Sequence, residues 1–148
     1  MVDIDTFDNQ IIHILEKDAT LTSSEIASKI KMSSSSIRRR IRRLTKLGIL
    51  RTIAVSDSFA LGYTLTAVIT LKVAIDQVDS VVHALSKRNE VIWASTVSGR
   101  FDVVALTRFR STEELSRFIK QELINIDGLK DTETFICLHV EKQPHFMM

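Results

Sequence analysis

Apolar residues in the first third of the chain recur at the three- and four-residue spacing that is typical of short α-helices. The inward face of a first helix is marked by Ile11, Ile12 and Leu15. The pattern Thr22-Ser23-Ser24-Glu25 is a capping box, which predicts the beginning of a second helix. Ser33 is the expected N-cap of a third helix, and Gly48 is placed to end it. The last two helices, separated by a short turn, predict a helix-turn-helix.

Further along, a strand is predicted over Leu50–Val55, followed by a connector over 56–63. From Thr64 the apolar spacing changes to two, the period of a β-strand. Strands are predicted over 64–73, 91–97, 102–109 and 132–140, with helical spacing at 78–85 and 115–123. This βαββαβ order predicts a ferredoxin-like α+β domain, a four-stranded sheet with both helices on one face. The Thr and Val side chains on the uncovered face of its first strand form a natural dimer surface.

Composition is that of a folded protein that does not depend on disulfides. The 148 residues are 45% hydrophobic and 26% charged. No apolar run approaches the roughly 20 residues of a membrane span, and the start of the chain lacks the features of a signal peptide. The single cysteine, Cys137, excludes an internal disulfide framework and fits a reducing compartment. We therefore expect a cytoplasmic protein with no membrane partner.

Positive charge is concentrated in the first part of the chain. Residues 1–52 hold ten Lys or Arg against six Asp or Glu, whereas the remainder holds ten against twelve. On the third helix the stripe expected to face the core consists of Ile37, Ile41 and Leu44. The opposite side carries Ser35, Arg39, Arg42 and Lys46, flanked by Arg38 and Arg43. Because like charges this close repel one another, the helix is predicted to bind a polyanion.

The helix-turn-helix docking mode assigns roles to these residues on double-stranded DNA. Residues near the start of the second helix of the motif reach base edges in the major groove. Here these are Ser34, Ser35, Arg38, Arg39 and Arg42, and the N-cap Ser33 is counted with them in the predicted DNA-binding set. Arg43 and Lys46 are expected to contact phosphates, and Arg40 to lay its methylenes along the core. Because one such helix reads only a few base pairs, a homodimer is expected.

The sequence gives little indication of a metal, cofactor or catalytic site. The spacing of the histidines is not that of a metal site, so no metal is predicted; they are His13, His83, His139 and His145. No phosphate-binding loop or Ser/His/Asp pattern is present, so neither a cofactor nor a catalytic residue is predicted. The turn at Gly99 and Asp102 by itself indicates only a hairpin.

Several of these motifs, taken in order, occur together in one known family. They are Glu25-Ile26-Ala27, Arg39-Arg40-Ile41-x-Arg43-Leu44-x-x-x-Gly48-Ile49-Leu50, Leu61-Gly62, Gly99-x-Phe101-Asp102 and Gly128-Leu129. Over nearly its whole length the chain resembles the Lrp/AsnC family of bacterial and archaeal transcriptional regulators. The resemblance implies a winged helix-turn-helix DNA-binding domain over 1–50, a hinge strand and linker over 51–63, and a βαββαβ effector-binding and oligomerisation domain over 64–148.

The resemblance also implies partners and a second site. Members form homodimers that assemble into tetramers or octamers, and they bind a small effector, often an amino acid. The implied effector-binding residues are Gly99, Arg100, Phe101, Asp102, Thr132 and Thr134. Arg100 replaces a frequent acid of the family, which implies an acidic or neutral ligand. Lys31 replaces the usual Gly of the helix-turn-helix turn, at a cost of about 1 kcal/mol if its φ is positive.

The function expected from sequence is therefore a sequence-specific DNA-binding transcriptional regulator, not an enzyme, whose assembly and DNA binding respond to a small effector. Two alternatives remain open. Sirohaem decarboxylases resemble the same two-part fold, although the arginine helix favours a regulator. An architectural protein that binds DNA without an effector would use the same charges.

Overall fold

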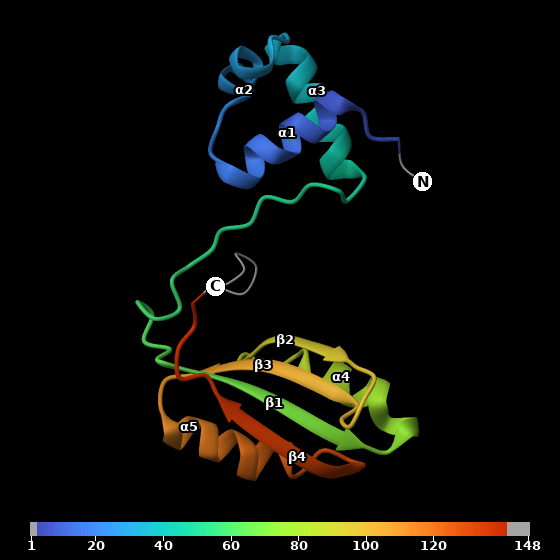
Figure 1. The fold of residues 1–148 in the computed structure, drawn as a ribbon, viewed down its shortest axis with the longest axis vertical. Helices are drawn as coiled ribbons and strands as arrows, with labels where there is room; N and C mark the ends of the chain where they lie inside the picture. The colour runs from blue at the N-terminus through green and yellow to red at the C-terminus, as the bar shows by residue number, and fades with distance from the viewer. Residues whose placement is uncertain (1–2, 142–148) are drawn as a thin grey trace. The chain divides into compact units, whose positions relative to one another are not determined.

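The computed structural model describes residues 3–141, and the chain divides into two compact units between Ala54 and Val55 (Figure 1). The first unit contains three helices, α1 (Thr6–Lys17), α2 (Ser23–Ile30) and α3 (Ser34–Lys46). Each begins at a residue whose side chain accepts a hydrogen bond from the first turn; these are Asp5, Thr22 and Ser33. The buried core of the unit consists of Ile11, Ile26, Ala27, Ile37 and Leu44. The predicted three-helix arrangement is confirmed.

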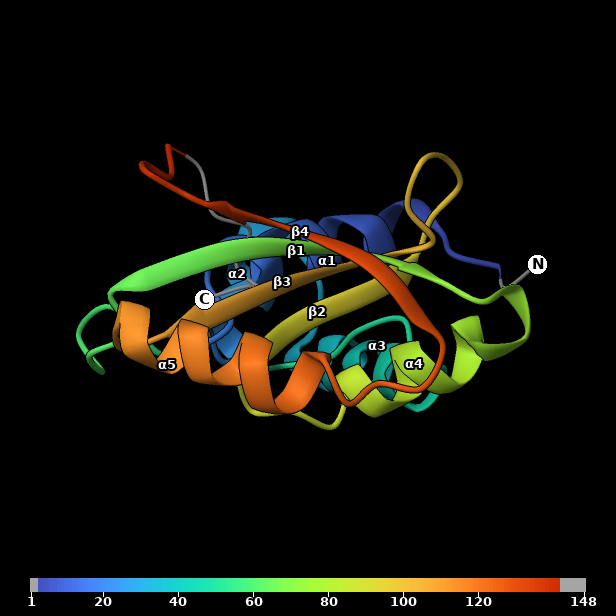
Figure 2. The same cartoon turned by 90° about the horizontal axis from the view of Figure 1, so that it is seen from below.

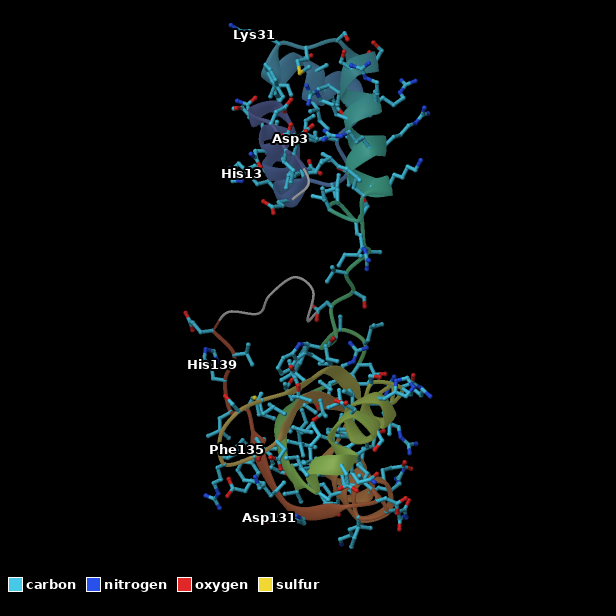
Figure 3. All side chains as sticks on the ribbon, turned by 90° about the vertical axis from the view of Figure 1, so that its right-hand side faces the viewer. Asp3, His13, Lys31, Asp131, Phe135 and His139 are labelled. Atoms are coloured by element: carbon cyan, nitrogen blue, oxygen red, sulfur yellow. The ribbon has the colours of Figure 1, made fainter. Side chains whose placement is uncertain are left out.

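The turn between α2 and α3 contains the one backbone strain that the sequence indicated. Lys31 ends α2 in the left-handed region, at φ 53° and ψ 48°, and its side chain is exposed (Figure 3). A side chain with a Cβ is disfavoured in this conformation. The conditional expectation of a strained turn at Lys31 is therefore confirmed.

The strand predicted over Leu50–Val55 is wrong. Residues 51–57 are exposed, and they form no strand in the described chain. A strand requires a neighbour that pairs with its backbone N–H and C=O groups, and the strand-favouring side chains of Ile53 and Val55 do not provide one. The three-helix unit therefore carries no β-strand that forms a wing.

The second unit is a four-stranded antiparallel sheet with the order β2-β3-β1-β4. Its strands are β1 (Leu65–Val73), β2 (Val91–Thr96), β3 (Val103–Phe109) and β4 (Leu129–Ile136). After β1 come the short η1 (Ile75–Gln77) and α4 (Val78–Leu85); after β3 come α5 (Thr112–Arg117) and a π-helical turn, η2 (Phe118–Leu123). This arrangement confirms the predicted βαββαβ domain.

The last strand is shifted toward the start of the chain: the sequence predicts 132–140, and β4 runs over Leu129–Ile136. It was expected to reach Val140, but it ends at Ile136, and Leu138 is 97% exposed. The backbone N–H of Cys137 makes one further hydrogen bond, to the carbonyl oxygen of Thr66. Continued in the register of Ala67 with Ile136, Val140 would lie opposite Tyr63, which precedes β1, so the last predicted residues have no strand beside them.

The two faces of the sheet differ in what covers them. Helices α4 and α5 lie on one face (Figure 2), and between them and the sheet lies a core that includes Ile69, Leu71, Val103 and Phe109. The other face carries apolar side chains without a covering layer in this chain. Phe135 of β4 is 52% exposed there (Figure 3), and Trp93 of β2 is 40% exposed.

Candidate DNA-binding and effector sites

The outer side of α3 is a row of basic side chains on a well-anchored helix. Ile37 and Leu44 are completely buried and hold the inner side of the helix in the core. At its end, the N–H of Gly48 bonds to the Thr45 carbonyl and that of Ile49 to the Leu44 carbonyl. This Schellman motif, with Gly48 at φ 71°, ends the helix where the sequence predicted.

The predicted outward residues are exposed, as the helical period requires. Four of them line a shallow groove of about 320 Å³; these are Ser35, Arg38, Arg39 and Arg42. Among the described residues, no carboxylate lies within 4.0 Å of the cationic groups of Arg38, Arg39, Arg42 or Lys46. Figure 3 shows nitrogen-tipped side chains that project outward from α3. The groove therefore offers several hydrogen-bond donors and no neutralising acid.

The two remaining arginines of α3 contact acids that the sequence reasoning had not placed near them. Arg40 Nη1 lies 2.7 Å from Asp5 Oδ2 and 2.8 Å from Asp8 Oδ1, and Arg43 Nη1 lies 2.8 Å from Asp8 Oδ2. Arg43 also donates to the Asp3 carbonyl oxygen. The charge of Arg43 is thus partly neutralised, and the expected phosphate contact has to compete with Asp8.

The sequence signal for this network is that two acids and two arginines have the same three-residue spacing. The acids are three residues apart on the first turn of α1, and so are Arg40 and Arg43 on α3. Three-residue spacing puts each pair on one face of its helix, so that two acids can meet two cations. The pattern is short, however, and only the packing of α1 against α3 decides whether the pairs meet.

Ser33, the first member of the predicted DNA-binding set, has a structural task. Its Oγ accepts the N–H of Ser36 at 3.3 Å and also lies 2.8 Å from the Ser36 hydroxyl. Ser34 is half-buried, whereas Ser35 is exposed in the groove. Of the three serines, Ser35 is therefore the one that the structure leaves best placed for a partner.

The turn that precedes β3 is held by its aspartate. Asp102 Oδ2 accepts the backbone N–H of Val73 at 2.9 Å, and Oδ1 lies 2.9 Å from Lys72 Nζ. The Val73 N–H first, and then the Lys72 ammonium, hold the pKa of Asp102 below its ordinary value. Asp102 is thus a charged residue that fixes the turn to the end of β1.

Beside Asp102, the turn carries a second ion pair and several unused backbone donors. Arg100 Nη2 lies 3.0 Å from Glu133 Oε1, and the Arg100 guanidinium stacks 5.2 Å from the Phe101 ring centroid. The N–H groups of Gly99, Arg100 and Phe101 make no hydrogen bond to any described residue. Successive unused amides of this kind can bind a carboxylate.

Within one chain the two threonines of the predicted effector site are not brought to this turn. Thr132 pairs with Leu71 and Thr134 with Ile69, so both threonines lie on the helix-covered side of β4. Thr132 Oγ1 donates to the Thr70 carbonyl oxygen at 3.0 Å. The β4 residue that meets the turn is Glu133, which points to the other side. Sequence reasoning missed both Glu133 and Lys72, because register across strands is not visible in a single segment.

For metals and membranes, the structure gives information only on the residues that it describes. In the part that the structure describes, no group of three or more His, Cys, Asp or Glu side chains is arranged to hold a metal ion. His145 lies outside the described residues. No described helix is long and apolar enough to cross a membrane.

With a basic helix-turn-helix in one unit and a four-stranded α+β layer in the other, the chain has the architecture of a DNA-binding regulator with a separate ligand-binding domain. Family models match both parts: the AsnC-type helix-turn-helix domain over residues 4–45 and the Lrp/AsnC ligand-binding domain over residues 66–145. The chain belongs to the Lrp/AsnC family of transcriptional regulators.

Individual relatives cover nearly the whole chain. An uncharacterised HTH-type transcriptional regulator of Pyrococcus horikoshii is 34% identical over 142 residues, 95% of this chain and 90% of that protein. The HTH-type transcriptional regulator FL11 of Pyrococcus furiosus is 33% identical over 141 residues, 95% of this chain and 93% of its own length.

Solved structures share the fold at lower identity. E. coli AsnC has a TM-score of 0.90 and 23% identity, and the match covers 97% of each chain. The L-Met complex of the transcriptional regulator NMB0573 from Neisseria meningitidis has a TM-score of 0.88 and 24% identity, over 95% of this chain and 94% of that one.

Proposed function

We propose that this regulator binds specific double-stranded DNA through the outer side of α3, and that a small neutral amino acid modulates its assembly and its DNA binding. The observation that carries the first part is the groove formed by Ser35, Arg38, Arg39 and Arg42. Its guanidinium groups have no acid within ion-pair distance among the described residues, so phosphates and guanine edges are their natural acceptors. Lys46 and, to a smaller extent, Arg43 extend this surface.

The effector is proposed to bind at the turn of Gly99, Arg100, Phe101 and Asp102, with Thr132 and Thr134 as further candidates. The unused turn amides suit a carboxylate, and the carboxylates of Asp102 and Glu133 suit an ammonium. Arg100 is paired with Glu133, and Lys72 is paired with Asp102. The two positive and two negative charges beside the turn therefore cancel. This balance favours a neutral side chain over the acidic one that Arg100 alone suggested. The Neisseria relative of similar fold was solved with L-Met, a neutral amino acid.

Assembly is proposed to begin with a homodimer formed through the uncovered face of the sheet. Phe135 and Trp93 expose large apolar surfaces there, and burying apolar area is the main favourable contribution to association. Dimers would then associate into tetramers or octamers. An effector that binds one assembly more tightly than another shifts the equilibrium between them, and thereby the spacing of the DNA-binding units.

A salt series of DNA-binding measurements tests the α3 assignment. Arg39→Ala and Arg42→Ala should weaken binding to a selected operator and flatten the dependence of log K on log salt by ~0.9 for each lost phosphate contact. Lys120→Ala, which removes an exposed charge from η2, is the matched control and should leave the slope unchanged. Unchanged affinity and slope in both arginine variants would refute the assignment.

Thermal-shift screening against the twenty amino acids tests the effector. A ligand present at 100 times its Kd stabilises the protein by about 2.7 kcal/mol. We expect a neutral amino acid to do so, and the shift to be lost in Arg100→Ala but retained in Arg110→Ala. No stabilisation by any of the twenty would refute an amino-acid effector.

A further inference from the structure

A second cavity lies at the opposite end of β3 from the effector turn. The turn of Gly99–Asp102 precedes β3, whereas this cavity is lined by Arg108 and Arg110 at the end of the strand. Seven residues of strand separate the two ends by roughly 20 Å. The cavity has a volume of about 310 Å³, which is at the lower end of the range for small-molecule sites.

Three arginines and the only tyrosine of the chain, Tyr63, line this cavity. The guanidinium carbons of Arg108 and Arg110 lie 4.6 and 4.7 Å from the centroid of the Tyr63 ring. Arg117, from the end of α5, is the third. Guanidinium groups on one ring repel each other, and an anion between them removes that repulsion.

The acids that share the cavity form no ion pair with these arginines. Glu114 Oε2 accepts the backbone N–H of Arg110, and Glu122 Oε2 lies 2.7 Å from Nη1 of Arg88, which is not among the lining residues. Glu90 is the third lining acid. Among the described residues, no carboxylate oxygen lies within 4.0 Å of a guanidinium nitrogen of the three lining arginines.

Two further features accompany this lining. Arg108 Nε is buried and has no hydrogen-bond partner among the described residues, although Nη1 of the same group donates to Ser58 Oγ at 2.7 Å. Buried donors are nearly always bonded, so the guanidinium of Arg108, which lines the cavity, keeps one unsatisfied donor among the described residues. The wall that contains Phe118, Gln121 and Glu122 is the π-helical η2, and π-turns occur frequently at functional sites.

We propose that this cavity binds a small organic oxyanion, a phosphate ester or a polycarboxylate, as a second ligand site separate from the effector turn. Arg110 and Arg117 bind its oxygens, and Arg108 and Tyr63 form the wall beside it. Because Arg108 also bonds to Ser58, the ligand would contact residues that hold the segment leading into β1.

Fluorine NMR of the full chain tests this proposal. Since Tyr63 is the only tyrosine, labelling with 3-fluorotyrosine gives one resonance, at the wall of the cavity. Inorganic phosphate, pyrophosphate and citrate are titrated separately, with ionic strength held constant by KCl. We expect at least one of them to shift the resonance saturably, and the one that binds best distinguishes a phosphate site from a carboxylate site.

Variants separate this site from other cationic surfaces. Arg110→Gln and Arg117→Gln should each weaken the saturable shift at least about tenfold, because each removes charge-assisted hydrogen bonds. Arg39→Gln on α3 and Arg100→Gln at the effector turn are the same chemical change elsewhere and should leave it unchanged. No saturable shift with any probe, or a shift that survives both cavity variants, would overturn the proposal.

Discussion

Arg40 of α3 donates a 2.8 Å hydrogen bond to Asp8 of α1, and this carboxylate has no solvent exposure. The other oxygen of Asp8 accepts from Arg43, and the same side chain caps the N-terminus of α1 by bonding to the Asp5 N–H. One carboxylate thus joins two helices and divides the arginines of α3 into two sets. Arg40 and Arg43 contribute to the packing of α3, while the outward arginines remain available for DNA.

The first prediction concerns Asp8→Asn, which keeps the shape of the side chain and removes its charge. Removal of one partner of a buried ion pair leaves the other poorly compensated, so the unfolding free energy of the helical unit should fall by about 3 kcal/mol. Hydrogen exchange, followed by mass spectrometry, should be faster in α1 and α3 and unchanged in β1 and β3. The control is Asp5→Asn, because the Asp5 side chain is 47% exposed and should matter less. Equal effects of the two variants would contradict the role given to Asp8.

The second prediction compares two neighbouring arginines. Arg42→Gln should reduce operator affinity and the salt slope more than Arg43→Gln, because the Arg43 guanidinium already bonds to Asp8 and to the Asp3 carbonyl. Arg43→Gln should instead lower the thermal stability of the helical unit. Both quantities come from the same two preparations, by fluorescence anisotropy with labelled DNA and by calorimetry. A larger loss of DNA affinity in Arg43→Gln would reverse the assignment.

Much of the fold could be predicted because its signals are local. The capping box at Thr22, the cap at Ser33 and the stop at Gly48 depend on contacts within four or five residues. The alternation from Leu65 to Val73 likewise records which side chains face the core. Such features are complete within one segment, so a single sequence contains them.

The errors concern relationships between distant segments. The β-branched residues Thr52, Ile53 and Val55 favour a strand, but a strand also needs a partner, and the described chain provides none. The threonines of β4 lie on the side of the strand away from Glu133, because the pairing of Thr132 with Leu71 sets which face each residue occupies. The acids beside Arg40 and Arg43 are more than thirty residues away along the chain. Secondary-structure propensity and the period of the apolar residues contain no information about such pairings.

The third prediction concerns the turn of the helix-turn-helix. Lys31→Gly should raise the unfolding free energy of the helical unit by up to about 1 kcal/mol, because glycine adopts the positive φ of this position without strain, although it also loses more chain entropy. Lys29→Gly is the matched control: it lies in the body of α2, where glycine should destabilise by about 1 kcal/mol. Urea unfolding followed by circular dichroism measures both. Destabilisation by Lys31→Gly would contradict the strain argument.

The last prediction concerns the pH dependence that Asp102 gives to the stability of the second unit, which contains the four-stranded sheet. The N–H of Val73 and the ammonium of Lys72 lower its folded pKa below the ordinary value of 3.8. A group with a depressed folded pKa stabilises the protein at pH values above its unfolded pKa, and this contribution is lost as the pH falls through the folded pKa. Asp102→Asn should therefore be less stable than the parent near neutral pH, and the difference should shrink as the pH falls below 3.8.

Trp93 provides the measurement, since it is the only tryptophan and lies in β2 of the same unit. Its fluorescence during urea unfolding gives the stability of this second unit at each pH. Asp79→Asn is the control, because Asp79 is exposed and its carboxylate makes no hydrogen bond to the described residues, so its pH profile should follow the parent. A stability difference between Asp102→Asn and the parent that stays constant with pH would show that the Asp102 carboxylate acts through shape and not through charge. In that case the ion pair with Lys72 would not be what holds the turn of Gly99–Asp102 to the end of β1.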